Sequence, residues 1–155
     1  MEVDRDVMVR DSRIISIQLE RAANRAMARL DLTAMQAKVL LYILDHADGG
    51  TSLTEIHREF GYSMAALCGL TKRLREKDYV RAEPCAGDDR RKLLFGTGKG
   101  EQVREGLDCA LMEIQDRLYD GFTEEELAAM DRLQKKMLRN LSAWRQCECK
   151  EVSDT

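Results

Sequence analysis

A mainly α-helical fold with one small β-hairpin is predicted by three features of this sequence. The 155 residues contain a single Pro and 34% charged residues, a composition typical of helical proteins. Capping boxes, in which a Ser or Thr and a Glu three residues later satisfy each other's backbone amides, are predicted at Ser52 and Thr123. Apolar residues recur at helical spacing over most of the chain, but segments 79–83 and 92–95 have the pattern of short strands.

Two helices are predicted before residue 48. After a loose charged lead, the first spans Arg10 to Leu30, and a row of Arg side chains on it is interpreted as a solvated face or, alternatively, as a surface for an acidic partner. Its apolar stripe consists of Ile15, Leu19, Ala22, Ala26 and Leu30, and the row consists of Arg21, Arg25 and Arg29. The second helix spans Ala34 to Ala47 behind a cap at Thr33, with Val39, Leu40, Ile43 and Leu44 facing inward. His46, at its end, is interpreted as a terminal residue favoured by the helix dipole, or alternatively as a ligand group.

Residues 52–77 have the spacing of a helix-turn-helix. A short helix starts near Leu53, and Gly61 permits the sharp turn that follows because it tolerates positive φ. Ser63 caps the next helix, in which Leu67, Leu70 and Leu74 repeat at helical spacing. Two short helices that share one small core in this way predict a DNA-binding unit whose second helix enters the major groove.

A wing is predicted after this unit. The first strand runs from Tyr79 to Glu83 and is ended by Pro84, and the second runs from Lys92 to Phe95. The charged loop 85–92 between them is expected to place Arg90 and Arg91 at a tip, where cations suit phosphates and the narrow minor groove.

Two further helices are predicted at the C-terminal end. A long helix opens between residues 97 and 100, is broken by Gly121 and Phe122, and is followed by a last helix from Thr123. Their apolar positions are Val103, Leu107, Leu111, Ile114 and Leu118 in the first, and Leu127, Met130, Leu133, Met137, Leu141 and Trp144 in the second. This stripe exceeds what one winged unit can cover, so we expect it to meet a second copy of the chain. Residues 146–155 are expected to form a flexible tail.

Charge is distributed unevenly along the chain. The net charge is −3, but residues 70–92 contain eight Lys or Arg against five Asp or Glu, which gives +3 there and −6 elsewhere. This pattern favours a local basic surface whose binding to nucleic acid depends strongly on salt.

There is no apolar run of the roughly 18 residues that a membrane span needs, and the first residues lack the apolar core of a signal peptide. Five Cys residues without a disulfide framework agree with a reducing compartment, so we expect a cytoplasmic protein with no membrane partner.

An enzyme is the alternative to a DNA-binding protein. The sequence has no phosphate-binding Gly loop, nucleophile elbow or HExxH motif, so we expect no enzyme, no cofactor and no metal. Cys147 and Cys149 are interpreted as two reduced thiols of the tail, with a soft-metal site as the alternative. Asp88 and Asp89 are expected to pair with the wing Arg residues rather than to act as acid and base.

With these motifs in this order, the sequence resembles the MarR family of winged helix-turn-helix transcription regulators over roughly residues 10–142. The main match is Asp-x-Arg followed by Thr-x-x-Gly, formed by Asp88, Arg90, Thr97 and Gly100. Supporting matches are Leu32-Thr33 with Gln36 and Leu40, Glu55-Ile56, Ser63, and Leu74 leading into Tyr79-Val80-Arg81. The sequence departs from the family pattern at His57, where an Ala is usual, at Met64-Ala65-Ala66-Leu67-Cys68, where Ser and Thr are usual, at Asp78, which replaces a Gly, and at Gly96, which replaces an apolar residue.

The resemblance implies a homodimeric repressor that binds double-stranded DNA and is released by a small aromatic or anionic ligand. It divides the chain into a DNA-binding lobe, 31–97, and a helical dimerisation region, 1–30 and 98–145. The DNA-binding residues expected are Ser52, Ser63, Met64, Ala65, Ala66, Cys68, Gly69, Lys72, Arg73, Asp88, Arg90, Arg91 and Lys92. The ligand pocket is expected near Arg25, Gln36 and Leu107.

Two alternative functions remain open at this stage. The start of the second helix of the unit, Met64 to Cys68, is poor in hydrogen-bonding groups, which favours a winged-helix module that binds protein instead of reading DNA. Cys68 lies near Lys72, which stabilises a thiolate, so a redox-sensing regulator is the other alternative. A small, buried and inert thiol is the simpler interpretation of Cys68.

Overall fold

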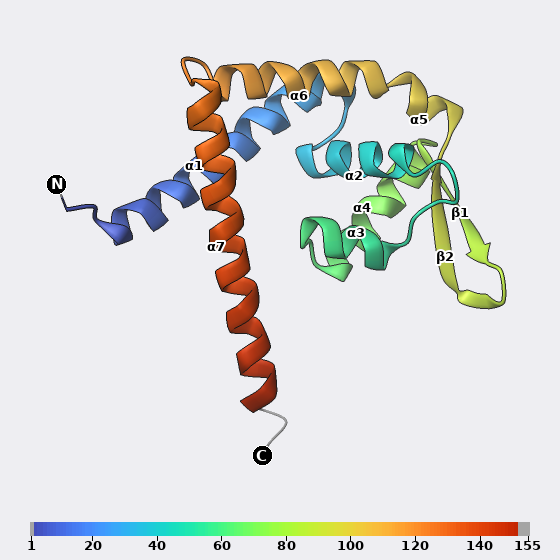
Figure 1. The fold of residues 1–155 in the computed structure, drawn as a ribbon. Helices are drawn as coiled ribbons and strands as arrows, with labels where there is room; N and C mark the ends of the chain where they lie inside the picture. Colours follow the sequence, from blue (N-terminus) through green and yellow to red (C-terminus); the bar gives the residue numbers. More distant parts are fainter. Residues whose placement is uncertain (1, 152–155) are drawn as a thin grey trace. The chain divides into compact units, whose positions relative to one another are not determined.

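The computed structural model describes residues 2–151, except for the side chains of Asp89 and of residues 145–151 (Figure 1). The chain forms two compact units, Met1–Asp116 and Arg117–Thr155. Its elements are α1 (Arg5–Met27), a 3₁₀ turn (Ala28–Leu30), α2 (Ala34–Asp45), α3 (Leu53–Phe60), α4 (Met64–Glu76), β1 (Val80–Cys85), β2 (Asp88–Gly96), α5 (Gly98–Gln102), α6 (Arg104–Leu118) and α7 (Glu124–Glu151). The predicted class, mainly α with a β-hairpin wing, is confirmed.

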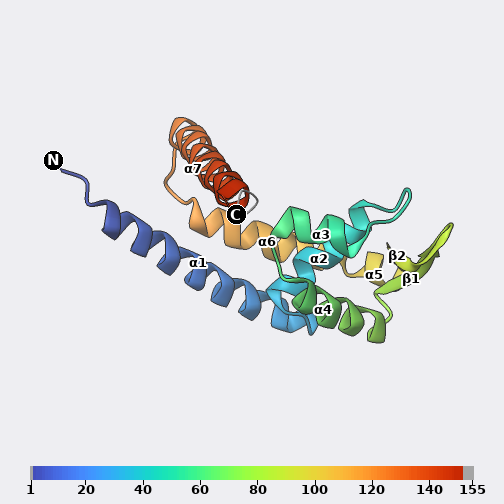
Figure 2. The same ribbon diagram turned by 90° about the horizontal axis from the view of Figure 1, so that it is seen from below.

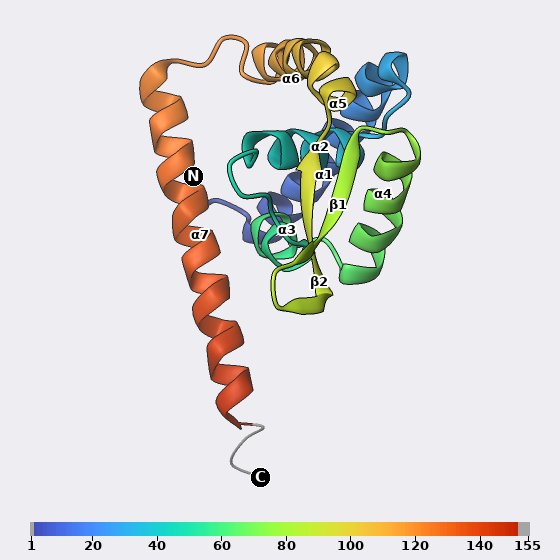
Figure 3. The same ribbon diagram turned by 90° about the vertical axis from the view of Figure 1, so that its right-hand side faces the viewer.

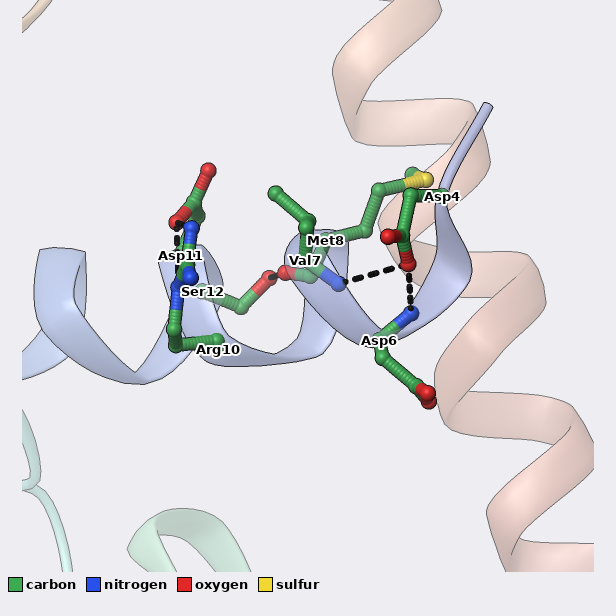
Figure 4. Close-up of polar contacts among 7 residues, drawn as sticks. All are labelled: Asp4, Asp6, Val7, Met8, Arg10, Asp11 and Ser12. Carbon is green, nitrogen blue, oxygen red and sulfur yellow. Dashed lines mark hydrogen bonds and ion pairs between the residues drawn. The ribbon is translucent and has the colours of Figure 1, made fainter. Parts of the chain in front are cut away.

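α1 starts earlier than the sequence pattern predicts. Residues before Arg10 were expected to be a loose lead, but Asp4 caps a helix there: its Oδ1 accepts hydrogen bonds from the backbone N–H groups of Asp6 (2.9 Å) and Val7 (3.1 Å). Figure 4 shows this cap together with the hydroxyl of Ser12, which donates to the carbonyl of Met8, and the ion pair between Arg10 and Asp11. The charged lead is therefore the first turn of the helix.

The part of α1 that enters the core is its C-terminal end. Ala23 and Met27 are buried, whereas Ile15, the first residue of the predicted apolar stripe, is 51% exposed. Figure 2 shows why: the N-terminal part of α1 extends beyond α2, α3 and α4. Four residues of the predicted stripe, Leu19, Ala22, Ala26 and Leu30, are half-buried, so the stripe borders the buried face of α1, and only Ile15 lies outside it.

The core of the first unit is formed by the elements of the helix-turn-helix and their neighbours. The side chains that are completely buried include Met27 of α1, Leu40 and Ile43 of α2, Ile56 of α3, Leu67 and Leu74 of α4, and Leu107 of α6. The inward positions predicted for α2 and α4 are all buried, which confirms the helical periodicity there.

β1 and β2 form an antiparallel pair in which Val80 faces Gly96 and Pro84 faces Lys92 (Figure 3). The prediction that Pro84 ends the first strand is wrong, because both strands of a two-stranded sheet are edges and the missing N–H of a Pro need not face the partner. The pairing shifts directly after it, between Pro84 and Cys85. The prediction of a charged loop over 85–92 is wrong too: the turn is confined to Ala86 and Gly87, and β2 begins at Asp88.

The single long helix predicted after the wing is interrupted at Val103, between α5 and α6. Arg104 follows the interruption and donates hydrogen bonds to Glu101 (2.6 Å) and to Asp45 at the end of α2 (2.7 Å). Both carboxylates raise the pKa of the Arg104 guanidinium, and Glu101 contributes more than Asp45. The predicted apolar face is nevertheless present, since Leu107 is buried and Val103 and Leu111 are half-buried.

The second unit consists mainly of α7. The predicted capping box is confirmed: Thr123 Oγ1 accepts from the N–H of Glu126 (3.2 Å), and Glu126 Oε2 accepts from the N–H of Thr123 (2.9 Å). Gly121, with φ of 80°, provides the predicted break before it. α7 continues to Glu151, into the segment 146–155 that was expected to be a tail, because no Gly or Pro interrupts it; residues 152–155 lie outside the described residues.

Candidate nucleic-acid interface

The N-terminus of α4 is defined by a tight turn and a cap. Gly61 ends α3 with φ of 71°, the left-handed conformation expected from the sequence. Ser63 then caps α4, and its Oγ accepts a hydrogen bond from the N–H of Ala66 (3.1 Å). The first turn of α4 therefore has a firm start at the surface of the lobe.

α4 has one buried and one exposed face. Leu67, Leu70 and Leu74 are buried, together with Thr71, whose hydroxyl donates to the carbonyl of Leu67 (2.8 Å). The eight residues predicted for this part of the interface are all exposed: Ser63, Met64, Ala65, Ala66, Cys68, Gly69, Lys72 and Arg73. The interpretation of Cys68 as a buried, inert thiol is therefore wrong, and the basic residues of the set lie in the later turns of the helix.

Ser52 is half-buried at the start of α3, where a small polar network holds the backbone. Glu55 Oε2 accepts hydrogen bonds from the hydroxyl of Thr51 (2.7 Å) and from the N–H of Ser52 (3.1 Å), and Ser52 Oγ accepts from the N–H of Glu55 (3.3 Å). The hydrogen bond from Thr51 contributes most to lowering the pKa of Glu55, and the hydrogen bond from the backbone of Ser52 contributes next. The hydroxyl of Ser52 is thus engaged in capping.

Thr51 was not singled out by the sequence analysis, although it connects the helix-turn-helix to the wing. It is completely buried, and its N–H and carbonyl pair with those of Leu94 in β2 at 3.1 and 2.7 Å. This isolated bridge ties the segment before α3 to the second strand of the hairpin. A β-branched residue between Gly50 and the cap at Ser52 was the only local signal of it.

The exposed cations of the wing lie on a strand. Arg90, Arg91 and Lys92 are consecutive residues of β2, so alternate side chains point to opposite faces of the hairpin. Asp88 Oδ1 accepts a hydrogen bond from the backbone N–H of Arg90 (3.0 Å) and thereby shapes the turn. A wing ion pair is present nearer the base, between Arg81 and Glu83, and Arg81 also lies over the ring of Phe95, 4.5 Å from its centroid.

The Thr-x-x-Gly motif joins the base of the wing to the end of α4. Thr97 caps α5 by accepting from the N–H of Gly100 (3.0 Å), and its hydroxyl donates to the carbonyl of Asp78. Asp78 adopts φ of 61°, as expected for a residue that replaces a Gly. A Cβ at Gly100 would lie 2.4 Å from the carbonyl oxygen of Tyr79, and one at Gly96 would lie 2.3 Å from a methyl of Leu44. Both glycines therefore permit close contacts.

The three residues expected at a ligand pocket occupy different environments. Leu107 is completely buried in the core, and Arg25 is exposed on α1. Gln36 is buried and is a member of the Thr33 capping box. It lines an open hollow of about 520 Å³, to which α1 contributes Asn24 and the end of α4 contributes Arg73 and Lys77.

Metal-binding clusters and membrane-spanning helices are absent from the described residues. No group of three or more His, Cys, Asp or Glu side chains among them is arranged to hold a metal ion. The side chains of Cys147 and Cys149 lie outside that part of the chain. Within it, no helix combines the length and apolar character needed to cross a bilayer.

The lobe thus contains two short helices joined by a tight turn, with an exposed second helix and a hairpin that projects beside it (Figure 3). This arrangement defines the class of winged helix-turn-helix proteins.

Comparisons with known proteins support the same class. A model of the MarR family matches residues 30–91. Similar solved structures include MepR of S. aureus in complex with DNA (24% identity, 90% of this chain and 99% of that chain, TM-score 0.79) and the transcriptional regulator SlyA (20% identity, 88% and 94%, TM-score 0.80). A mutant of MarR from E. coli complexed with operator DNA is also similar (25% identity, 89% and 99%, TM-score 0.77). The match over the DNA-binding lobe and these similar structures together support a winged-helix transcription regulator of the MarR type.

Proposed function

We propose that this protein is a DNA-binding transcription regulator that acts as a homodimeric repressor. The observation that carries the proposal is the exposed face of α4, which presents the Ser63 cap, small side chains and two cations outward from a well-packed lobe. A helix with small residues in its first turns approaches the major groove closely, and Lys72 and Arg73 then lie within reach of phosphates. MepR and MarR, which are similar in fold, are known in complexes with DNA.

The wing supplies a second contact in this proposal. Arg90 and Arg91 are exposed on β2 and bind backbone phosphates or the neighbouring minor groove. Binding of this kind falls as salt rises, because each neutralised phosphate releases counterions.

The two-fold dimer is proposed from the apolar residues that the second unit leaves exposed. Leu133, Met137, Leu141 and Trp144 follow one another at helical spacing along α7 and are 50 to 63% exposed. A stripe of this length is unusual on the surface of a monomer, and a second copy of the chain provides a matching surface. We assign segments 1–30 and 98–145 to this dimerisation region and 31–97 to the DNA-binding lobe.

Release by a small aromatic or anionic ligand completes the proposal. The hollow beside Gln36 borders both α1 and the end of α4, so a molecule bound there contacts the helix that we assign to the major groove. Displacement of the protein from labelled DNA by a series of aromatic carboxylates tests this step, and Gln36→Ala should weaken the response.

The experiment that tests DNA binding combines selection with a wing variant. Fragments selected from random DNA by the unmodified protein are titrated at several salt concentrations with the protein and with Arg90→Ala/Arg91→Ala. We expect weaker binding to all fragments and a slope of log affinity against log salt that is smaller by about 1.8, because each phosphate contact contributes about 0.9.

A matched control removes two exposed cations that lie outside the proposed DNA interface, Lys38 of α2 and Lys136 of α7. Lys38→Ala/Lys136→Ala should leave the slope unchanged. An equal slope in the wing variant and the unmodified protein contradicts the wing assignment. If the unmodified protein binds no DNA in a salt-dependent manner, the protein-interaction module, which the small apolar start of α4 favours, becomes the better function.

A further inference from the structure

The ring of His57 contacts the turn that leads into α4. Its Nδ1 lies 2.5 Å from the carbonyl oxygen of Tyr62, in the three-residue connection between α3 and α4. A carbonyl oxygen only accepts, so Nδ1 carries the proton and donates, which both the Nδ1–H tautomer and the imidazolium allow. The backbone carbonyl of His57 also accepts from the N–H of Gly61 (2.8 Å). One residue of α3 therefore contacts two of the three residues of the turn.

Aromatic packing also holds the turn. The rings of Tyr62 and Phe60 are stacked with centroids 5.5 Å apart, and Phe60 meets Tyr42 of α2 edge to face at 5.6 Å. The ring of Tyr62 is thus held by Phe60 of α3, which in turn packs on α2, and its carbonyl is held by His57. The next residue is Ser63, the cap of α4. The direction in which α4 leaves the turn depends on the backbone orientation at Tyr62.

We propose that His57 is a positioning residue for DNA binding: its Nδ1 hydrogen bond to the carbonyl of Tyr62 orients the turn and so preorganises α4. The proposal rests on the proposed DNA-binding function. His57 is exposed, so the ring reaches the turn without displacing core residues.

The size of the effect follows from preorganisation. A hydrogen bond that is present equally in the free and the DNA-bound protein does not change the affinity. It changes the affinity only through the fraction of the free protein in which the turn already has the orientation needed for binding. The net contribution of one such hydrogen bond corresponds to a factor of about two to ten in the ratio of correctly to incorrectly oriented turns. The apparent Kd should rise by up to the same factor when the bond is lost, and by the full factor when the correct orientation is the minor one.

Three substitutions separate the hydrogen bond from other roles of the ring. The amide nitrogen of Asn reaches the position of Nδ1, that of Gln reaches the position of Nε2, and Ala offers no donor. We expect His57→Ala and His57→Gln to raise the Kd for a selected DNA fragment about two- to tenfold, and His57→Asn to stay within about twofold of the unmodified protein. Fluorescence anisotropy measures Kd, and amide hydrogen exchange at Ser63 and Met64 reports on the turn directly.

Lys38 provides the control, because it is exposed on α2 and lies outside the proposed DNA interface. Lys38→Ala should leave the Kd unchanged. Circular dichroism confirms that each variant is folded before titration.

The outcomes decide between the possible roles. Equal affinity in all variants overturns the proposal, and so does loss in His57→Asn as large as in His57→Ala. Retention in His57→Gln with loss in His57→Asn also overturns it, because the ring then contacts DNA through Nε2. If the unmodified protein binds no DNA, the proposed function fails, but hydrogen exchange still tests the turn: faster exchange in the Ala and Gln variants than in the Asn variant supports the hydrogen bond, and equal exchange refutes it.

Discussion

Replacement of Gly100 by Ala should destabilise the protein by displacing the base of the wing. An added Cβ would lie 2.4 Å from the carbonyl oxygen and 3.2 Å from the carbonyl carbon of Tyr79. These are backbone atoms, and the same carbonyl accepts the N–H of Thr97 (3.1 Å), so the clash is not relieved by a change of side-chain rotamer. Either α5 or the start of β1 has to move.

Overpacking of this kind costs about 1 to 3 kcal/mol. For a chain of this length, that lowers Tm by roughly 2 to 12 °C. Helix propensity acts in the opposite direction, since Ala is favoured over Gly in a helix by up to about 1 kcal/mol, so the lower half of the range is the better expectation.

Gly98 supplies the control because it lies in the same helix and an added Cβ there would meet no atom within 4 Å. Gly98→Ala should therefore leave Tm unchanged or raise it slightly. Thermal unfolding followed by circular dichroism at equal protein concentration compares the two, since the Tm of an oligomer depends on concentration. Equal Tm values for Gly98→Ala and Gly100→Ala would refute the close contact at Tyr79.

Three further predictions follow from the cap, the α7 stripe and the exposed thiol. The folded-state pKa of Glu55 lies below its ordinary value of 4.5, so its contribution to stability is present above that pH and is lost as the pH falls through the lowered pKa. The free energy of unfolding, measured with urea between neutral and acid pH, should accordingly depend less on pH for Glu55→Gln than for the unmodified protein. The same pH dependence in both proteins would contradict this. Leu133→Glu/Met137→Glu should give monomers or aggregates by light scattering, whereas a monomeric unmodified chain would rule out the dimer. Peroxide should weaken DNA binding of the unmodified protein but not of Cys68→Ser, since added charge beside phosphates is repulsive; equal loss in both excludes the thiol as the trigger.

The sequence by itself determined the features that depend on residues close together in the chain. The caps at Ser52, Ser63 and Thr123 were predicted correctly because a cap and its amide lie within three residues of each other. The buried faces of α2 and α4 were correct because helical periodicity needs only local spacing. The exposed residues of α4 in the proposed interface follow from that same periodicity.

Contacts between distant residues were decided only by the tertiary structure. The pairing of Thr51 with Leu94 and the extension of β1 through Pro84 depend on which strand lies alongside, which no local pattern reports. The interruption at Val103 lies beside Arg104, which bonds to Asp45 of α2, a residue far away in the sequence. The hydrogen bond from His57 to Tyr62 spans only five residues, yet it too depends on how the turn folds back on α3, because a ring nitrogen and a carbonyl meet only when the backbone between them has its final conformation.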